Sequence, residues 1–208
     1  MIRGQLRPAL LLTLVLCVLT GMIYPGIVTG LAQGLFPSQA NGSLVTVNGK
    51  VVGSALIGQP FSRPEYFHPR PSAAGSGYDA AASSGTNKGP VDRKLADTLV
   101  ALRVDSAVAD LRIARGAVPS DLVTASASGL DPHISPANAQ AQVARVASAR
   151  GVDSAAVRTL VASRTEGRQF GIFGESRVNV LLLNIAVDSQ FPMRQAAISV
   201  PASPSTTR

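Results

Sequence analysis

The chain has 208 residues, of which 46% are apolar, and it carries a formal net charge of +7. This length predicts one domain with an appendage, and the apolar fraction is sufficient for a core although only 4% of the residues are aromatic. The basic residues are scattered and do not alternate with aromatic residues, which argues against nucleic-acid binding. Cys17 is the only cysteine, which excludes an intrachain disulfide bond.

A long apolar segment follows two arginines at the N-terminus. No charged residue occurs between Arg7 and Lys50, and residues 9–32 are mostly aliphatic or small. A helix over these residues measures about 36 Å, which is enough to cross a hydrocarbon core of about 30 Å. We therefore predict a short cytoplasmic N-terminus over residues 1–8 and a transmembrane helix over residues 9–32.

A cleaved signal peptide is the alternative for this segment. Residues 10–19 could form its apolar region, and the tripeptide at residues 30–32, Gly-Leu-Ala, offers a weak cleavage site. The apolar run continues well beyond residue 19, which favours an uncleaved anchor. Because the arginines lie only on the N-terminal side, the positive-inside rule predicts that the N-terminus is cytoplasmic and that the domain lies outside the cytoplasm.

Three glycines in the same segment are spaced every four residues: Gly26, Gly30 and Gly34. On a helix they form one smooth face that lets a second helix approach closely, which predicts a partner within the membrane. The alternative is that they only loosen the exit of the chain from the membrane, together with Pro25 and Pro37.

After a linker over residues 33–43, the sequence predicts a hairpin and then a long loop. Asn48-Gly49 lies between β-branched runs, which is typical of a two-residue hairpin turn, and the second strand could continue to Ile57. Residues 59–90 are rich in Pro, Gly, Ser and Ala, yet they contain four aromatic side chains, which predicts a loop packed against the domain.

The remainder of the chain predicts helices followed by a strand. Apolar periodicity indicates a helix over residues 92–113, and residues 122–124 could be a short strand or a turn. Ser135-Pro136 begins a helix that ends at Gly151, and Asp153 caps another that stops before Gly167. Residues 178–187 are almost wholly apolar, which predicts a strand buried on both faces. Residues 44–190 thus form a compact α+β domain with a mixed β-sheet, and residues 191–208 form a flexible tail.

The chain contains little that is typical of an active site. It has no phosphate-binding loop, no Asp-Lys-Thr-Gly phosphorylation sequence and no Gly-x-Ser-x-Gly turn. Two separated histidines and one cysteine cannot form a structural zinc site, so we expect no metal. Residues 126–135 contain serines near Asp131 and His133, so a membrane-anchored, extracytoplasmic Ser/His/Asp hydrolase is the alternative function. A polar loop before a capped helix explains the same residues.

Several motifs together resemble one known family. A pattern F-x-x-P-x-Y-F-x-x-R-P-S begins at Phe61, S-G-L-D-P-H-I-S-P covers residues 128–136, and R-V-N-V-L covers residues 177–181. The chain resembles the C subunit of the Kdp-type potassium-transporting P-type ATPase from the anchor to Asp188. Thr86 and Lys88 depart from the residues more usual in that family, which puts in doubt only a strict side-chain role for their loop.

This resemblance implies a non-catalytic subunit of a high-affinity potassium uptake pump in a bacterial-type inner or plasma membrane. The implied partners are a hydrolytic subunit and a potassium-conducting subunit, besides the lipid bilayer. The implied role is to assist assembly and to raise the ATP affinity of the hydrolytic subunit. Because ATP is cytoplasmic and the domain is expected outside, such an effect would pass through the membrane subunits. The domain could instead cap the outer mouth of the potassium pathway.

If the domain contacts ATP or a partner directly, residues 126–142 are the candidate region. Within it we single out Ser128, Asp131, His133 and Gln142 as nucleotide or partner contacts. Helix capping and core packing are the alternative explanation for each of them.

Overall fold

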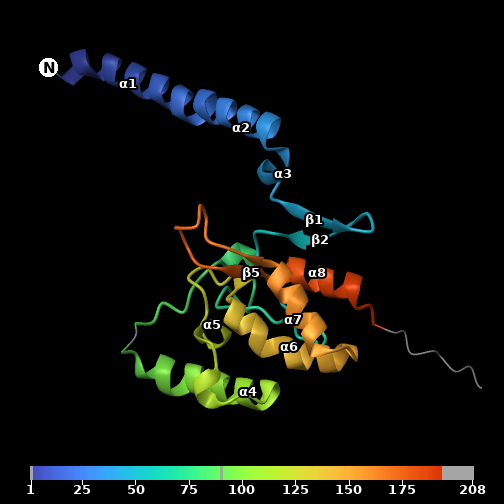
Figure 1. The fold of residues 1–208 in the computed structure, drawn as a ribbon. Helices are drawn as coiled ribbons and strands as arrows, with labels where there is room; N and C mark the ends of the chain where they lie inside the picture. Colours follow the sequence, from blue (N-terminus) through green and yellow to red (C-terminus); the bar gives the residue numbers. More distant parts are fainter. Residues whose placement is uncertain (1, 90, 194–208) are drawn as a thin grey trace, which may run out of the picture. The chain divides into compact units, whose positions relative to one another are not determined.

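The computed structural model describes residues 2–89 and 91–193. By the density of its contacts the chain divides into two compact units, Met1–Ile57 and Gly58–Arg208. Figure 1 shows the helices and strands along the chain.

The first unit begins with one continuous helical segment. It consists of α1 (Ile2–Val18), a π-helical turn (Leu19–Ile23) and α2 (Tyr24–Leu35). Pro25 has no N–H and its ring crowds the preceding turn, and the wider π turn accommodates both effects without ending the helix. Residues Gly4–Leu35 are long and apolar enough to cross a membrane, and none of their most apolar stretch is buried within the chain. This finding agrees with the predicted transmembrane helix.

A short helix and a hairpin complete the first unit. Helix α3 (Pro37–Ala40) is followed by strands β1 (Leu44–Val47) and β2 (Lys50–Ser54), which pair antiparallel. Asn48 and Gly49 both have positive φ, 51° and 77°, so the predicted hairpin turn is confirmed. The second strand ends at Ser54 and does not continue to Ile57.

The second unit contains five helices and three short strands among its described residues. A π-helical segment (Lys94–Val100) leads into α4, and 3₁₀ turns occupy Ala80–Ala82 and Arg115–Ala117. The helices are α4 (Ala101–Leu111), α5 (Ser120–Val123), α6 (Pro136–Arg150), α7 (Ser154–Ser163) and α8 (Val180–Gln190), and the strands are β3 (His133–Ile134), β4 (Thr165–Glu166) and β5 (Arg177–Asn179).

The three strands form a small sheet in the order β3-β5-β4. His133 pairs with Asn179 on one side of β5, and Thr165 pairs with Val178 on the other. The α+β class is therefore confirmed, but the expectation of a mixed sheet is wrong, because both pairings are antiparallel. The mixed sheet was expected around a central strand over residues 178–187, and most of that run is helix α8.

The apolar run at residues 178–187 was predicted to be a buried strand, and this prediction is wrong. Only Val178 and Asn179 of this run belong to a strand, and helix α8 begins at Val180. The side chain of Asn179 accepts a hydrogen bond from the Leu182 amide and so caps the helix. A helix surrounded by protein is apolar on most sides, so it loses the periodicity that separates it from a buried strand.

The other predicted helix boundaries are largely confirmed. Ser135 caps α6 by accepting from the Asn138 amide, Gly151 ends it with φ of 65°, and Asp153 caps α7. The helix expected over residues 92–113 is present over 94–111, with a π-helical first half. Residues 120–123 form a single helical turn where a short strand or a turn was expected.

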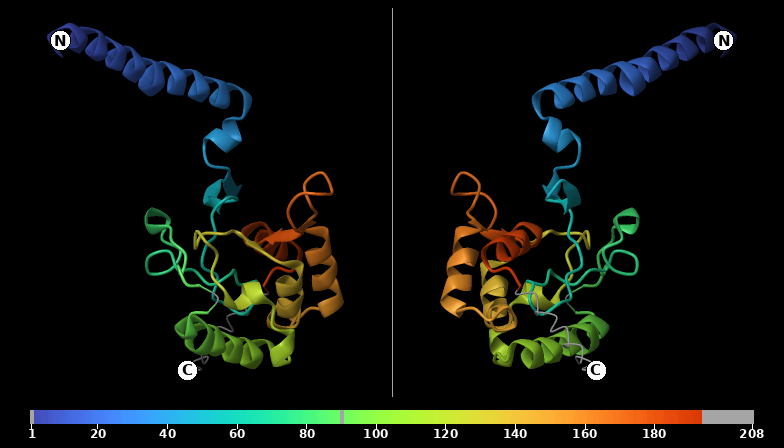
Figure 2. Two further views of the ribbon diagram at one scale, coloured as in Figure 1. Left: turned by 90° about the vertical axis from the view of Figure 1, so that its left-hand side faces the viewer. Right: turned by 90° about the vertical axis from the view of Figure 1, so that its right-hand side faces the viewer.

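Helices α6, α7 and α8 pack with β3 and β5 around the core of the second unit, as the views in Figure 2 show. Phe67 joins this core from the long loop and is fully buried, which confirms that the loop is packed. Phe191, the first residue of the expected flexible tail, is partly buried against the core. The rest of that tail, residues 194–208, lies outside the described residues.

Candidate partner and ligand site

Two buried amide side chains hold the long loop against the helices. Asn184 of α8 accepts from the Phe67 amide at 2.8 Å and donates to the Phe67 carbonyl at 3.0 Å. Gln142 of α6 does the same at His68, at 2.7 and 3.0 Å. Each amide therefore satisfies both backbone polar groups of one residue, as a neighbouring strand would.

Gln142 is also engaged by its own helix. Its Nε2 donates to Oδ1 of Asn138 at 2.7 Å, and its Oε1 accepts from the Arg145 guanidinium at 2.7 Å. The side chain is fully buried. All of its hydrogen-bonding capacity is used within the protein.

Two arginines of α6 extend this attachment. Arg145, whose side chain is only 8% exposed, forms an ion pair with Asp110 of α4 and donates to the Tyr66 carbonyl. The side chain of Arg150 is fully buried, pairs with Asp188, and lies over the Tyr66 ring at 4.9 Å from its centroid. Helices α4, α6 and α8 are thereby joined through one loop.

His68 lies beside Arg145 in an uncharged state. Burial lowers the pKa of His68, and the positive charge of Arg145 lowers it further. Nε2 lies 3.0 Å from the Arg63 carbonyl and Nδ1 lies 2.7 Å from Arg145, so the neutral tautomer that fits carries its proton on Nε2.

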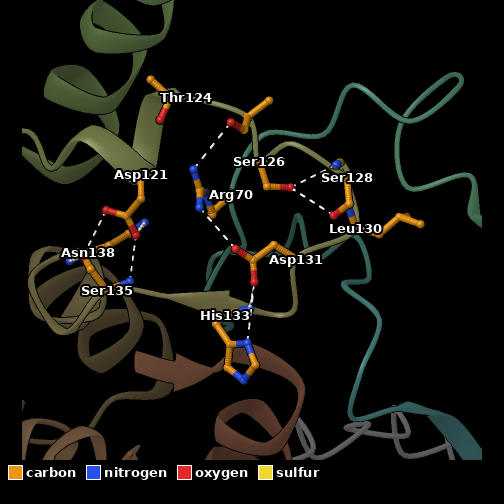
Figure 3. A network of polar contacts seen from close by, with 12 residues as sticks. Arg70, Asp121, Thr124, Ser126, Ser128, Leu130, Asp131, His133, Ser135 and Asn138 are labelled. Atoms are coloured by element: carbon orange, nitrogen blue, oxygen red, sulfur yellow. Dashed lines mark hydrogen bonds and ion pairs between the residues drawn. The ribbon is translucent and has the colours of Figure 1, made fainter. Parts of the chain in front are cut away.

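The block from Ser126 to Pro136 is arranged around Asp131 (Figure 3). Asp131 accepts from Arg70 at 3.1 Å and from the His133 amide at 2.9 Å. Burial alone would raise the pKa of Asp131, but hydrogen bonds from His133 and the charge of Arg70 outweigh it and hold that pKa below its ordinary value. The carboxylate is therefore ionised and paired at neutral pH.

The serines of this block stabilise turns. The Ser126 hydroxyl accepts from the Gly129 amide, and the Ser128 hydroxyl accepts from the Leu130 amide. Ser135 donates its hydroxyl to Asp121, which also accepts from the Ser135 amide. These three hydroxyls therefore bond to groups other than the His133 ring. A Ser/His/Asp hydrolase requires a hydrogen bond between the serine hydroxyl and the histidine ring, and none of the three forms it.

Two clefts border this framework. The first encloses about 530 Å³ and is basic, because three arginines line it against one aspartate. The second encloses about 640 Å³ and contains both signs of charge. Side chains in the first include Phe61, His68, Arg70, Tyr78, Arg103, Asp110, Gln142 and Arg145, and those in the second include Arg70, Asp121, Asp131, His133, Glu175 and Arg177.

The four candidate residues are not gathered at one site. Gln142 lies at the first cleft, Asp131 and His133 lie at the second, and Ser128 lies outside both linings. Arg70 borders both clefts. Arg70 and Arg145 were not among the candidates predicted from the sequence, and only the R-P-S motif pointed toward Arg70.

An apolar helix long enough to cross a membrane, followed by a compact α+β domain, fits the class of single-pass membrane proteins. The family model of the K+-transporting ATPase c chain, KdpC, matches residues 6–189, and the chain belongs to this family. The resemblance found in the sequence is therefore confirmed, and with it a role as a subunit in potassium transport.

Several relatives named potassium-transporting ATPase KdpC subunit are similar over nearly the whole chain. A protein of Gemmatimonas aurantiaca is 63% identical over 186 residues, covering 89% of this chain and 92% of the relative. A protein of Myxococcus xanthus is 57% identical and covers 92% of each chain. A protein of Koribacter versatilis is 52% identical, covering 92% of this chain and 97% of the relative.

Proposed function

We propose that this chain is a non-catalytic accessory subunit of an ATP-driven potassium uptake pump. It assists assembly of the hydrolytic and potassium-conducting subunits and raises the ATP affinity of the hydrolytic subunit. Its N-terminus lies in the cytoplasm and its domain outside, at a bacterial inner or plasma membrane. The charge asymmetry around the N-terminal helix supports this orientation.

The non-catalytic role is supported chiefly by one observation: the candidate polar side chains form hydrogen bonds within the domain itself. The hydroxyls of Ser126, Ser128 and Ser135, the amide of Gln142 and the carboxylate of Asp131 all bond to the framework that fixes the loops. Such groups build a rigid binding module, whereas a nucleophile must remain free to attack.

The proposed effect on ATP follows from linkage. Suppose that the domain binds the membrane subunits more tightly when they hold ATP than when they do not. The difference between these two binding free energies then raises the ATP affinity of the hydrolytic subunit by an equal amount, without any contact between the domain and ATP. Direct contacts from Ser128, Asp131, His133 or Gln142 are the alternative. Gln142 is the weakest of these four candidates, because it is fully buried and fully bonded.

The face formed by Gly26, Gly30 and Gly34 is the proposed contact within the membrane. A Cβ atom added at any of these positions would meet nothing within 4 Å of it in this chain. The space beside the glycines is therefore open to a partner helix.

The test is to express the other pump subunits with the full chain and with a chain that ends after residue 43. Potassium-stimulated ATP hydrolysis is then measured in membranes over a range of ATP concentrations. We expect the shortened chain to raise the KM for ATP by roughly 5-fold or more, within the usual range of coupling energies.

The level of assembled complex, measured by gel filtration in mild detergent, separates lost coupling from lost assembly. An assembled complex with unchanged KM for ATP and unchanged activity would contradict the proposal. A full-length Gln140→Ala chain is the control, because Gln140 is exposed on α6.

A further inference from the structure

The loop between β4 and β5 presents three large apolar side chains to solvent. Phe170 is 93% exposed, Ile172 is 72% exposed and Phe173 is 64% exposed. The loop projects from the rest of the second unit in all the views of Figures 1 and 2. We call residues 169–173 the apolar tip.

The tip has a defined backbone conformation. Gln169 and Phe173 exchange two backbone hydrogen bonds of 2.9 Å each, which close the turn. Phe170 and Gly171 have positive φ, 54° and 75°. The apolar side chains are therefore held out by a structured turn, and a contiguous exposed apolar group of this kind marks an interaction site.

The stem of the loop is charged and is basic on balance. It contains Arg164, Arg168 and Arg177 against Glu166 and Glu175, and Arg177 pairs with Glu166 at 3.0 Å. An apolar tip beside arginines such as Arg164 and Arg168 fits a bilayer surface, where the apolar groups enter the acyl region and the guanidinium groups meet phosphate.

Residues 36–57, which connect the membrane helix to the second unit, enter that unit near this stem. Gly58, the first residue of the second unit, donates its amide to the Leu130 carbonyl at 2.7 Å. The neighbouring Asp131 lines the same cleft as Glu175 and Arg177. Residues 36–57 could extend at most about 75 Å even without the hairpin, which sets the greatest distance at which Gly58 can lie from the end of the membrane helix.

A protein partner fits the tip less well. A stable protein interface buries about 800 Å² on each side, and three side chains on a convex turn surrounded by charges do not provide such a surface. We propose that the apolar tip inserts into an anionic phospholipid bilayer and holds the domain against the membrane that its own helix spans. This inference requires the membrane anchor but is independent of the role in the pump.

The chain contains no tryptophan, so a single substitution provides a unique fluorescent reporter. Full-length Phe170→Trp, Ile172→Trp and Leu102→Trp chains are reconstituted in vesicles of phosphatidylcholine and phosphatidylglycerol with brominated acyl chains. Leu102 is the matched control, because it is 64% exposed on α4, away from the loop in the views of Figures 1 and 2. Flotation of the vesicles confirms anchoring in each case.

We expect the two tip reporters to show blue-shifted emission and quenching by brominated lipid several times stronger than that of Leu102→Trp. Quenching of the tip reporters should weaken when phosphatidylglycerol is omitted or Arg168→Gln is added. Water-like emission of both tip reporters, equal to the control, would overturn the proposal. A blue shift that occurs only with the other pump subunits present would also overturn it, in favour of a protein contact. Equal quenching without phosphatidylglycerol would overturn the part assigned to the arginines.

Discussion

In this domain, single side chains form hydrogen bonds to backbone groups that a neighbouring strand would pair with in a larger sheet. Asn184 and Gln142 satisfy the backbone of Phe67 and His68 in a loop that has no strand partner there. A buried N–H and C=O left without partners cost far more than an average hydrogen bond contributes. The fold therefore depends on these two amides.

Replacing Gln142 with alanine leaves the backbone groups of His68 unpaired in a partly buried site. We expect Gln142→Ala to lower the free energy of unfolding by roughly 1–3 kcal/mol, measured by thermal or urea unfolding of the full chain in detergent. Gln140→Ala, at an exposed position of the same helix, should change it by less than about 0.5 kcal/mol. Equal stability of the two variants would show that Gln142 does not have this structural role. If Gln142→Ala also left pump activity unchanged, Gln142 would be excluded as a ligand contact.

The lowered pKa of His68 predicts a pH dependence with a definite sign. Burial and then Arg145 hold this pKa below its ordinary value of 6.5, so the unfolded chain binds a proton at a pH where the folded chain does not. The contribution of His68 is complete above pH 6.5 and is lost as the pH falls from 6.5 through the folded pKa.

We therefore expect the melting temperature to fall between pH 7.5 and pH 5.5, and to fall less in His68→Gln, when both are followed by circular dichroism. An identical decrease in the two proteins would assign the pH dependence to other groups.

At the scale of elements, sequence patterns predicted the boundaries that local chemistry determines. Asn48-Gly49 predicted the hairpin, and Ser135 and Gly151 predicted the two ends of α6, because the backbone angles and caps there depend on neighbouring residues alone. Helix α8 was predicted as a strand, because its burial on nearly all sides comes from tertiary packing that the sequence does not reveal. The mixed sheet was expected around that central strand, so this prediction was wrong for the same reason.

The site was less predictable than the elements. The sequence indicated that residues 126–142 are special, and the structure places them in turns, caps and two clefts. Gln142 is nearly 75 residues from the loop it holds, and its pairing with His68 has no local signal in the sequence. Arg70 and Arg145 were missed because a lone arginine resembles any exposed charge until its partners are known.

Close packing between two loops makes Gly129 a sensitive position. Its φ is +68°, and a Cβ there would lie 2.6 Å from the Ser84 carbonyl oxygen and 2.7 Å from the Ala74 nitrogen. We expect Gly129→Ala to destabilise the domain by roughly 2 kcal/mol through backbone strain and displacement of the loop. Gly116→Ala is the control, since a Cβ there meets nothing within 4 Å. Similar unfolding midpoints for the two variants would contradict the close approach.

At the scale of the whole molecule, the orientation is the next property to test. We expect Ala162→Cys, in a Cys17→Ala background, to react with a membrane-impermeant maleimide from outside the cytoplasmic compartment. Gly4→Cys in the same background should react only after permeabilisation. The opposite labelling pattern would place the domain in the cytoplasm and permit direct contact with ATP.

Co-purification tests the central claim, membership of a potassium pump, most directly. A tagged full-length chain is isolated from native membranes in mild detergent, and the eluate is analysed for polytopic partners and for ATP hydrolysis stimulated by potassium. We predict that the hydrolytic and potassium-conducting subunits elute with the chain and that the eluate hydrolyses ATP when potassium is added. The account would be contradicted if the chain eluted alone and if membranes that lack the chain kept their full potassium-stimulated ATPase activity.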